Sequence, residues 1–286
     1  MRKFVIAAVA AVSVLAVAAV AYAANVYTVD GSTSPRGKGS ASKPLPVSLN
    51  FDFSVRDENP AFRGTPIEKY FIGAEGLVTY PEEFPTCSGG TGGANHSDLD
   101  RVKQLCRKAR VGGGFIFAYG GPVPDQTVKL NCVLELNLYN LKPGNYGARG
   151  RISKKNGGLA IRVDGKQMIP PALDKKYAKD GGQCALPQNE AILAPYKAVK
   201  IKGVTSDELQ FTVPQSLLHP APGNETVVQM VDSAVRKLTA TKRIKGKNRK
   251  VGFYSAIGCK GNQRSIQVTF ITEANQRTPL SKNMPC

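Results

Sequence analysis

Hydrophobic and polar residues alternate along much of the chain, and segment 47–55 shows the clearest alternation. Every second position of this segment is apolar, in the order Val47, Leu49, Phe51, Phe53 and Val55. A period of two places successive side chains on opposite faces of a β-strand. The segment therefore predicts a strand that buries one face and exposes the other.

Short apolar segments recur to the end of the chain, separated by turn-forming Gly, Pro, Asn and Asp residues. Segment 226–238 is ambiguous, because the spacing of Val227, Val231 and Val235 fits a helix whereas the β-branched composition favours a strand. About 10–12 short strands predict an all-β fold, either an antiparallel β-sandwich of Ig-like or jelly-roll-like type or a barrel. The other predicted strands are 25–29, 67–71, 76–80, 111–119, 128–139, 159–163, 198–201, 209–213, 250–257 and 265–272.

One short helix is predicted at 98–106. Leu99, Val102 and Cys106 are spaced for one helical face, and Ser97 or Asp98 precedes them as an N-cap. A loop Ca²⁺ site built from Asn95, Asp98 and Asp100 is the alternative, because Ca²⁺ accepts oxygen ligands at loose spacing. The pattern favours capping and surface roles for these three residues.

Composition divides the chain into four parts. Residues 1–23 form a predicted signal peptide, and 24–46 combine a first strand with a linker rich in Gly, Ser and Pro. Residues 47–200 are predicted as the main β-sandwich, although 165–195 are rich in Pro and Lys and predict irregular structure. Residues 201–286 are predicted as C-terminal β-hairpins, packed on the sandwich or continuous with it.

The N-terminal 24 residues have the pattern of an export signal. Arg2 and Lys3 precede an apolar run, which ends in Ala21-Tyr22-Ala23, a cleavage-site pattern of small residues. An uncleaved membrane anchor is the alternative, since a spanning helix needs about 20 apolar residues. The pattern favours cleavage after Ala23 and a mature protein that is secreted or held in the cell envelope, with no transmembrane segment.

Six cysteines are expected to form disulfides in such an oxidising compartment. Fifteen connectivities are possible for six cysteines. Pairing of neighbours is the working hypothesis, and a zinc site is disfavoured because no C-x-x-C pair occurs. The hypothesis joins Cys87 to Cys106, Cys132 to Cys184, and Cys259 to Cys286.

The chain is strongly basic, with a formal net charge of +18. Its densest basic run contains no acidic residue and is followed by two aromatic rings, Phe253 and Tyr254, of a kind that stacks on a base or a sugar. The run predicts a polyanion-binding lobe, with an anionic cell-wall polymer as the partner; a solvated hairpin tip that prevents aggregation is the alternative. Its members are Arg236, Lys237, Lys242, Arg243, Lys245, Lys247, Arg249 and Lys250.

Motifs for catalysis are absent from the sequence. His96 and His219 are the only histidines, no G-x-S-x-G elbow occurs, and no Gly-rich segment has the context of a phosphate-binding loop. We therefore expect a non-enzymatic protein without catalytic residues, cofactor or metal, and without sequence-specific nucleic-acid binding. An extracellular hydrolase acting on polysaccharide or peptide, with His219 in a catalytic triad, is the alternative.

Four segments stand out together, at residues 25–29, 106–114, 217–223 and 250–259. They resemble a family of secreted, disulfide-containing, β-rich proteins of actinobacteria. These segments start the mature chain, follow the predicted helix, surround His219 and precede Cys259. The resemblance implies a secreted β-rich protein with disulfides, and it carries no assigned activity.

Overall fold

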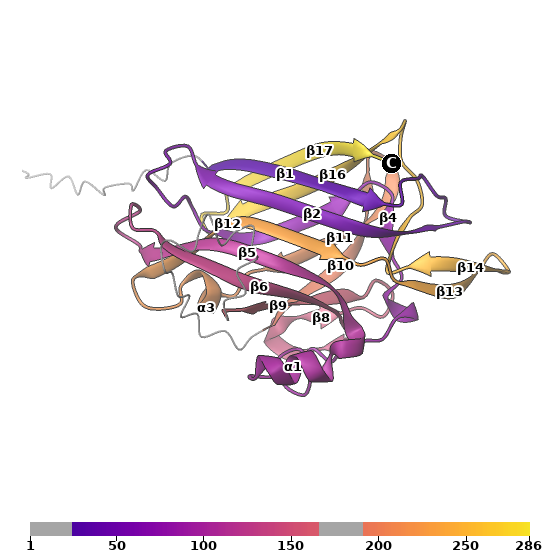
Figure 1. The fold of residues 1–286 in the computed structure, drawn as a ribbon, viewed down its shortest axis with the longest axis horizontal. Coiled ribbons are helices and arrows are strands. Elements are labelled where there is room, and N and C mark those ends of the chain that lie inside the picture. The colour runs from indigo at the N-terminus through magenta and orange to yellow at the C-terminus, as the bar shows by residue number, and fades with distance from the viewer. Residues whose placement is uncertain (1–24, 166–190) are drawn as a thin grey trace, which may run out of the picture.

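The computed structural model describes residues 25–165 and 191–286. Antiparallel strands dominate these residues, as Figure 1 shows, and the all-β prediction is confirmed. The strands are β1 (Asn25–Ser34), β2 (Leu45–Asp57), β3 (Ile67–Ala74), β4 (Leu77–Thr79), β5 (Arg110–Pro122), β6 (Leu130–Asn140), β7 (Gly144–Asn145), β8 (Arg151–Ile152), β9 (Gly158–Asp164), β10 (Ile192–Ile201), β11 (Val204–Thr212), β12 (Asn224–Val235), β13 (Thr239–Ile244), β14 (Lys247–Gly252), β15 (Tyr254–Ala256), β16 (Gln263–Thr272) and β17 (Arg277–Pro285).

The described helices are short. The predicted helix is present as α1 (Leu99–Leu105), and Asp98 caps it by accepting from the backbone N–H groups of Asp100 and Arg101. A second helix, α3 (Gln215–Leu218), lies between β11 and β12. Three 3₁₀ turns complete the set, at Pro81–Glu83, Arg107–Ala109 and Gly147–Arg149.

Thirteen strands of the described chain are hydrogen-bonded into a single sheet. Its order is β17-β16-β3-β11-β10-β9-β6-β5-β12-β2-β15-β4, with β1 also paired to β2. Strands from residues 201–286 alternate with earlier ones, because β12 lies between β5 and β2 and β16 pairs with β3. The C-terminal third is therefore continuous with the sheet that residues 47–200 build.

The sheet curls so that β17, its edge strand at one end, lies next to β1, the strand that pairs with β2 near the other end (Figure 1). Side chains join the ends: the rings of Tyr27 and Phe270 stack with centroids 4.6 Å apart, and Lys282 of β17 forms an ion pair with Asp30 of β1. Gly31 permits this close approach, because a Cβ there would lie 2.7 Å from Ile266 Cδ1. The curled sheet thus encloses an apolar interior.

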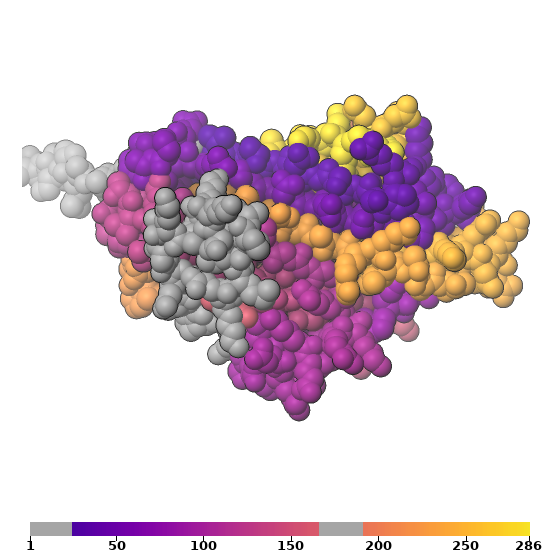
Figure 2. All heavy atoms as spheres, in the orientation of Figure 1, coloured from indigo at the N-terminus to yellow at the C-terminus, as the bar shows by residue number. Residues whose placement is uncertain are grey.

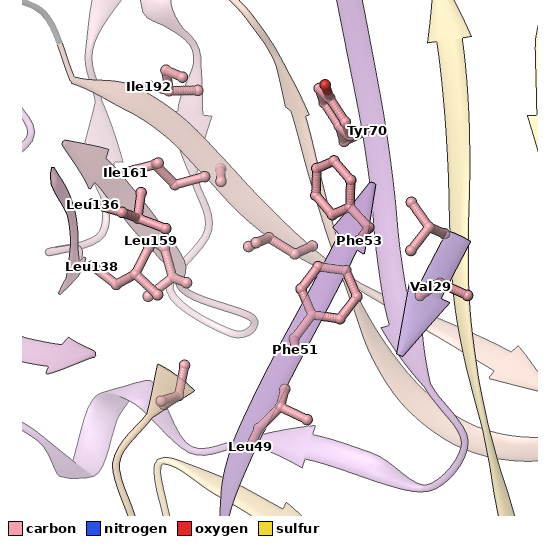
Figure 3. Close-up of a cluster of buried hydrophobic side chains, with 14 of the residues drawn as sticks. Val29, Leu49, Phe51, Phe53, Tyr70, Leu136, Leu138, Leu159, Ile161 and Ile192 are labelled. Atoms are coloured by element: carbon pink, nitrogen blue, oxygen red, sulfur yellow. The ribbon is translucent and has the colours of Figure 1, made fainter. Parts of the chain in front are cut away.

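The main core fills this interior, and the alternating segment 47–55 contributes to it as predicted. Phe51 and Phe53 of β2 are both buried. Figure 3 shows them across from Leu136 and Ile161, which belong to β6 and β9. A smaller cluster packs beneath α1 and contains Cys87, Cys106 and their apolar neighbours.

Several strands are longer than the hydrophobic pattern indicates. β1 continues to Ser34, within the expected linker, and β10 begins at Ile192, within the segment expected to be irregular. Strand β17 has no counterpart among the predicted strands, because it is an edge strand whose side chains are mostly exposed and polar. These residues are strand because their backbone hydrogen-bonds to a neighbouring strand. Such pairing leaves no hydrophobic periodicity in the sequence.

The ambiguous segment 226–238 is strand over most of its length. β12 pairs with β2 on one side and with β5 on the other, and its register to β5 shifts between Val228 and Met230. The bulge moves the inward-facing positions from even to odd residue numbers, because one extra residue reverses the alternation of a strand. This reversal is why the segment lacks a clean period of two.

Candidate functional site

The basic run folds mainly into the hairpin of β13 and β14, which is a separate two-stranded sheet. Figure 1 and Figure 2 show this hairpin projecting from one end of the molecule. Its two-residue turn has positive φ at both central residues, 47° at Lys245 and 76° at Gly246. This turn matches the twist of the strands, and glycine adopts it without strain. The turn therefore holds the basic residues on a defined two-faced ribbon.

The hairpin register divides the basic residues between its two faces. Thr241 lies opposite Lys250, and Arg243 opposite Asn248, so that these four residues share one exposed face. Lys242 lies opposite Arg249 on the other face, where both are half-buried. Two faces therefore replace the single lobe expected from the sequence.

Lys242 anchors the hairpin to the body of the protein. Its ammonium forms ion pairs with Glu82 and with Glu83, the latter at 3.1 Å, and lies 5.1 Å from the centroid of the Tyr80 ring. Burial opposes its charge, but the hydrogen bonds to the two glutamates outweigh burial and raise the pKa of Lys242. This cation is neutralised by its partners, and its role is to brace the hairpin.

Six of the eight predicted polyanion-binding residues are exposed. None of the six forms an ion pair with a carboxylate in the described part of the chain, although the Arg236 guanidinium donates to the main-chain oxygen of Arg110. Their positive charges therefore face solvent. The six are Arg236, Lys237, Arg243, Lys245, Lys247 and Lys250.

The two aromatic residues after the run do not contribute a stacking surface. Phe253 is fully buried and Tyr254 nearly so. The Tyr254 hydroxyl lies 2.8 Å from that of Tyr196, and burial raises the pKa of Tyr254. The prediction that these rings face a ligand is wrong, because both pack into the main core where β15 joins β2.

His219, the residue considered for a hydrolase, contacts a carboxylate. Its Nε2 lies 2.8 Å from Glu273 Oε1, which also accepts from Gln215 at 3.2 Å. The hydrogen bond to Glu273 raises the pKa of His219, and a bond to the main chain of Asn224 adds to the effect. No hydroxyl hydrogen-bonds to His219 among the described residues, so the hydrolase hypothesis stays a prediction.

Two of the three expected disulfides are present. Cys87 is bonded to Cys106, which ties α1 to the preceding loop, and Cys259 is bonded to Cys286, which ties down the end of β17. Cys132 is buried in the sheet, whereas Cys184, its expected partner, lies outside the described residues.

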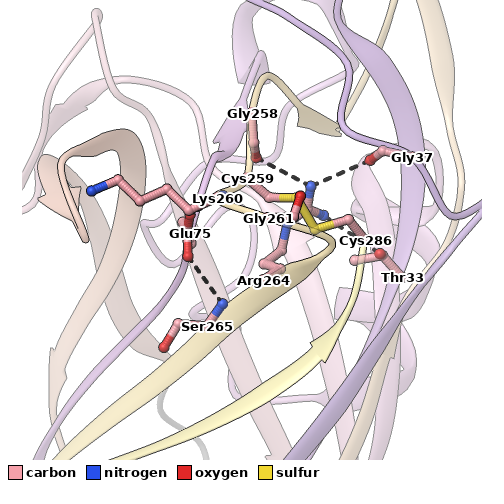
Figure 4. Close-up of a disulfide and its surroundings, with 10 residues drawn as sticks. All are labelled: Thr33, Gly37, Glu75, Gly258, Cys259, Lys260, Gly261, Arg264, Ser265 and Cys286. Carbon is pink, nitrogen blue, oxygen red and sulfur yellow. Dashed lines mark hydrogen bonds between the residues drawn. A yellow bond between two sulfur atoms is a disulfide. The ribbon is translucent and has the colours of Figure 1, made fainter.

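Two buried charged residues, Arg264 and Glu75, lie near the C-terminal disulfide (Figure 4). Arg264 Nη2 lies 3.4 Å from Gly258 O, and Glu75 accepts from the backbone N–H of Ser265 at 3.3 Å. Burial lowers the pKa of Arg264 to about 10, opposed by the charge of Glu75. The disulfide therefore secures β17 beside a buried polar network.

The candidate Ca²⁺ ligands serve the local structure. Asp98 caps α1, and Asn95 Oδ1 accepts from the backbone N–H of Ala191 at 3.0 Å. His96 Nδ1 lies 3.0 Å from the N–H of Asp98. Within residues 25–165 and 191–286, no group of three or more His, Cys, Asp or Glu side chains is arranged to hold a metal ion.

The helices in the described ranges are all too short or too polar to cross a membrane. Comparison of the chain with protein-family models, with curated proteins and with solved structures gives no match. Inference about function therefore rests on the side chains of this chain alone, and the exposed basic hairpin is its clearest surface feature.

Proposed function

We propose that this protein is exported, has no enzymatic activity, and associates with anionic polymers of the cell envelope through the hairpin of β13 and β14. The observation that carries the proposal is a projecting ribbon whose exposed cations have no carboxylate partner among the described residues. A polyanion neutralises such cations while it releases its own counterions. The signal-like N-terminus and the disulfides support a location outside the cytoplasm.

The anchoring of the hairpin supports a binding role. Lys242 fixes the ribbon to Glu82 and Glu83, so the backbone that carries the exposed cations is held in place before any partner arrives. Preorganisation lowers the entropy lost on binding, because fewer groups must be ordered in the complex. The exposed face that carries Thr241, Arg243 and Lys250 combines hydroxyl and cationic donors.

Binding to polygalacturonate, a uronic polymer, tests the proposal. We expect the purified mature protein to bind at 50 mM salt and to lose at least about tenfold in affinity by 200 mM, since charge-driven association weakens as counterions compete. A variant with Gln at Lys237, Arg243, Lys247 and Lys250 is expected to bind weakly and with a smaller dependence on salt. This variant keeps the turn and the Lys242 anchor.

The matched control removes the same charge elsewhere. Gln at Lys154, Lys155, Lys197 and Lys200, all exposed and outside the hairpin, lowers the net charge by the same amount. We expect this control to retain most of the affinity. Equal losses in the two variants would mean that overall charge, and not the hairpin, drives association, and affinity that is independent of salt would contradict an electrostatic mechanism.

A further inference from the structure

The interior of the curled sheet contains a cavity of about 140 Å³. Strands β2, β3, β5, β6, β9, β10, β11, β12 and β15 line it, and the helix α3 adds its leucines. Figure 3 shows part of this lining, with Phe51 and Phe53 on one side and Leu136, Leu138 and Leu159 on the other. Protein interiors are close-packed, and voids much larger than a water molecule are few. A cavity of this size therefore needs a physical explanation.

The lining of the cavity extends along the strands, and β12 illustrates this extent. Its lining along β12 extends from Thr226 to Val235, and extended strand rises about 3.3 Å per residue. The bulge between Val228 and Met230 keeps both halves of β12 turned inward, first at even and then at odd positions. A volume of about 140 Å³ within so extended a lining is better suited to one flexible alkyl chain than to a rigid ring, because a flexible chain can follow the strands.

Among the described residues, the lining is almost entirely apolar and includes no charged side chain. Its polar groups mostly have partners: the Ser233 hydroxyl donates to Phe51 O at 3.0 Å, and the Tyr254 hydroxyl pairs with Tyr196. A buried water needs about two to four polar partners, which this surface does not supply. An uncharged apolar occupant suits the space better than water does.

The Tyr70 hydroxyl is the exception in this lining. The residue is 2% exposed, and its oxygen has no hydrogen-bond partner in the described structure. Aromatic neighbours hold its ring, with Phe211 stacked at 5.1 Å and Phe53 at 5.3 Å between centroids. Burial raises the pKa of Tyr70, so the hydroxyl remains neutral. A buried polar group without a partner is unfavourable, and one hydroxyl or carbonyl on a bound molecule would satisfy it.

A short segment crosses one end of the cavity. Residues 213–223 connect β11 to β12, which are separated by four strands in the sheet, and Leu217 and Leu218 of α3 point their apolar surface into the lining. Outside, Gln215 and His219 both contact Glu273, in the turn between β16 and β17. Because this segment covers one end of the cavity, its displacement would give a ligand a route of entry.

We propose that the cavity binds a linear, uncharged alkyl chain that carries one hydroxyl or carbonyl group, with Tyr70 as the polar contact. The class includes medium-chain alcohols. The proposal is independent of polyanion binding, because α3 and the basic hairpin lie at opposite ends of the molecule in Figure 1.

A series of straight-chain alcohols tests the proposal by calorimetric titration. From 1-butanol to 1-octanol, each added methylene is expected to raise affinity about fourfold until the cavity is full, after which the increments stop. Cyclohexanol is expected to bind more weakly than 1-hexanol because of its shape. Octanoate is expected to bind far more weakly than 1-octanol, since its charge would be buried without a cation.

Two variants locate the binding site. Ala118 is fully buried and lines the cavity, so Ala118→Leu fills part of the space and is expected to abolish binding of 1-octanol. Ala61→Leu adds the same atoms at an exposed position and is the control. Tyr70→Phe keeps the ring and removes the hydroxyl, and we expect about two- to tenfold weaker binding of alcohols with the chain-length increments unchanged.

The outcomes distinguish a saturable internal site from non-specific adsorption of alcohols to the protein surface. The proposal would be overturned if no alcohol of the series bound saturably. It would also be overturned if affinity rose with every added methylene without limit. If Ala118→Leu does not fold, Leu136→Ala serves instead. This variant enlarges the cavity, so affinity is expected to keep rising with chain length up to longer alcohols than in the unmodified protein. The variant with Gln at Lys237, Arg243, Lys247 and Lys250 is expected to bind 1-octanol like the unmodified protein, so either proposal can fail without the other.

Discussion

Asp52 of β2 lies directly opposite Asp232 of β12 in the sheet register. Across the other edge of β2, Asp52 also lies opposite Asp30 of β1, so that three carboxylates form a row on the outer surface. Of the three, only Asp30 forms an ion pair within the described chain, with Lys282. Burial, and then the charges of Asp30 and Asp232, raise the pKa of Asp52. Like charges opposite one another destabilise a sheet.

Asp52→Asn is therefore expected to stabilise the protein at pH 7, by about 0.2–1 kcal/mol at low salt. When folding raises the pKa of a carboxyl, the folded protein loses stability as the pH rises toward that raised pKa. The reason is that the unfolded chain then binds fewer protons than the folded protein. The gain should be present at pH 7 and shrink as the pH falls toward 3. Urea unfolding at both pH values measures it, with exposed Glu58→Gln as the control.

The contact of His219 with Glu273 predicts a different pH dependence for the cover of the cavity. A histidine whose pKa is raised on folding adds stability that is full below its unfolded pKa and is lost as the pH rises through the folded pKa. His219→Gln is expected to cost about 0.2–1 kcal/mol at pH 5.5 and much less at pH 8.5, since both side chains are partly exposed. Glu273 and the nearby Glu225 are the acids that act on this histidine. A loss that is equal at both pH values would show that charge has no part in the contact.

Arg63 and Glu225 form a buried ion pair, with Nη2 of Arg63 2.9 Å from Oε1 of Glu225. Arg63 is fully buried and also donates to the main-chain oxygens of Asp125 and Pro122, each at 2.7 Å. Glu225→Ala leaves the guanidinium without its carboxylate and is expected to destabilise by about 3–5 kcal/mol. The double change Arg63→Met with Glu225→Met is expected to recover part of this loss, which denaturant midpoints measure. A single variant as stable as the native protein would contradict this account.

The disulfide between Cys259 and Cys286 predicts the behaviour of the C-terminal edge. Cys286→Ser is expected to destabilise the protein by about 2–4 kcal/mol, because the bond constrains the unfolded chain. Within the described residues strand β17 pairs only with β16, so its amides should lose protection from hydrogen exchange before those of β3. Cys87→Ser is the comparison, and it should expose α1 and leave β17 protected.

Some elements followed directly from the sequence because their signals are local. The alternation at 47–55 predicted β2, since one buried and one exposed face need a period of two, and Asp98 marked the start of α1 through its side-chain cap. β17 was not predictable in this way: its residues are polar, and only pairing with β16 makes them a strand. The bulge in β12 concealed a strand by reversing its alternation.

At the candidate site, too, some features of the basic residues have a local signal in the sequence and others depend on distant contacts. Their density at 236–250 is a property of the sequence, and so is the Lys245–Gly246 turn that folds them back on themselves. The neutralisation of Lys242 depends on Glu82, which lies 160 positions earlier in the chain. The burial of Phe253 and Tyr254 depends on where β15 joins the sheet. Neither fact has a local signal.

By itself, the sequence determined an all-β protein with a basic run, an export-like N-terminus and cysteines in number for disulfides, because composition and short periodicities are local properties. Only the tertiary structure decided that the strands join in one curled sheet, which basic residues face solvent, and that an apolar cavity remains inside. The physical reason is that strand order and cavity shape arise from contacts between residues far apart in the chain, as the pairing of β12 with β2 and β5 illustrates.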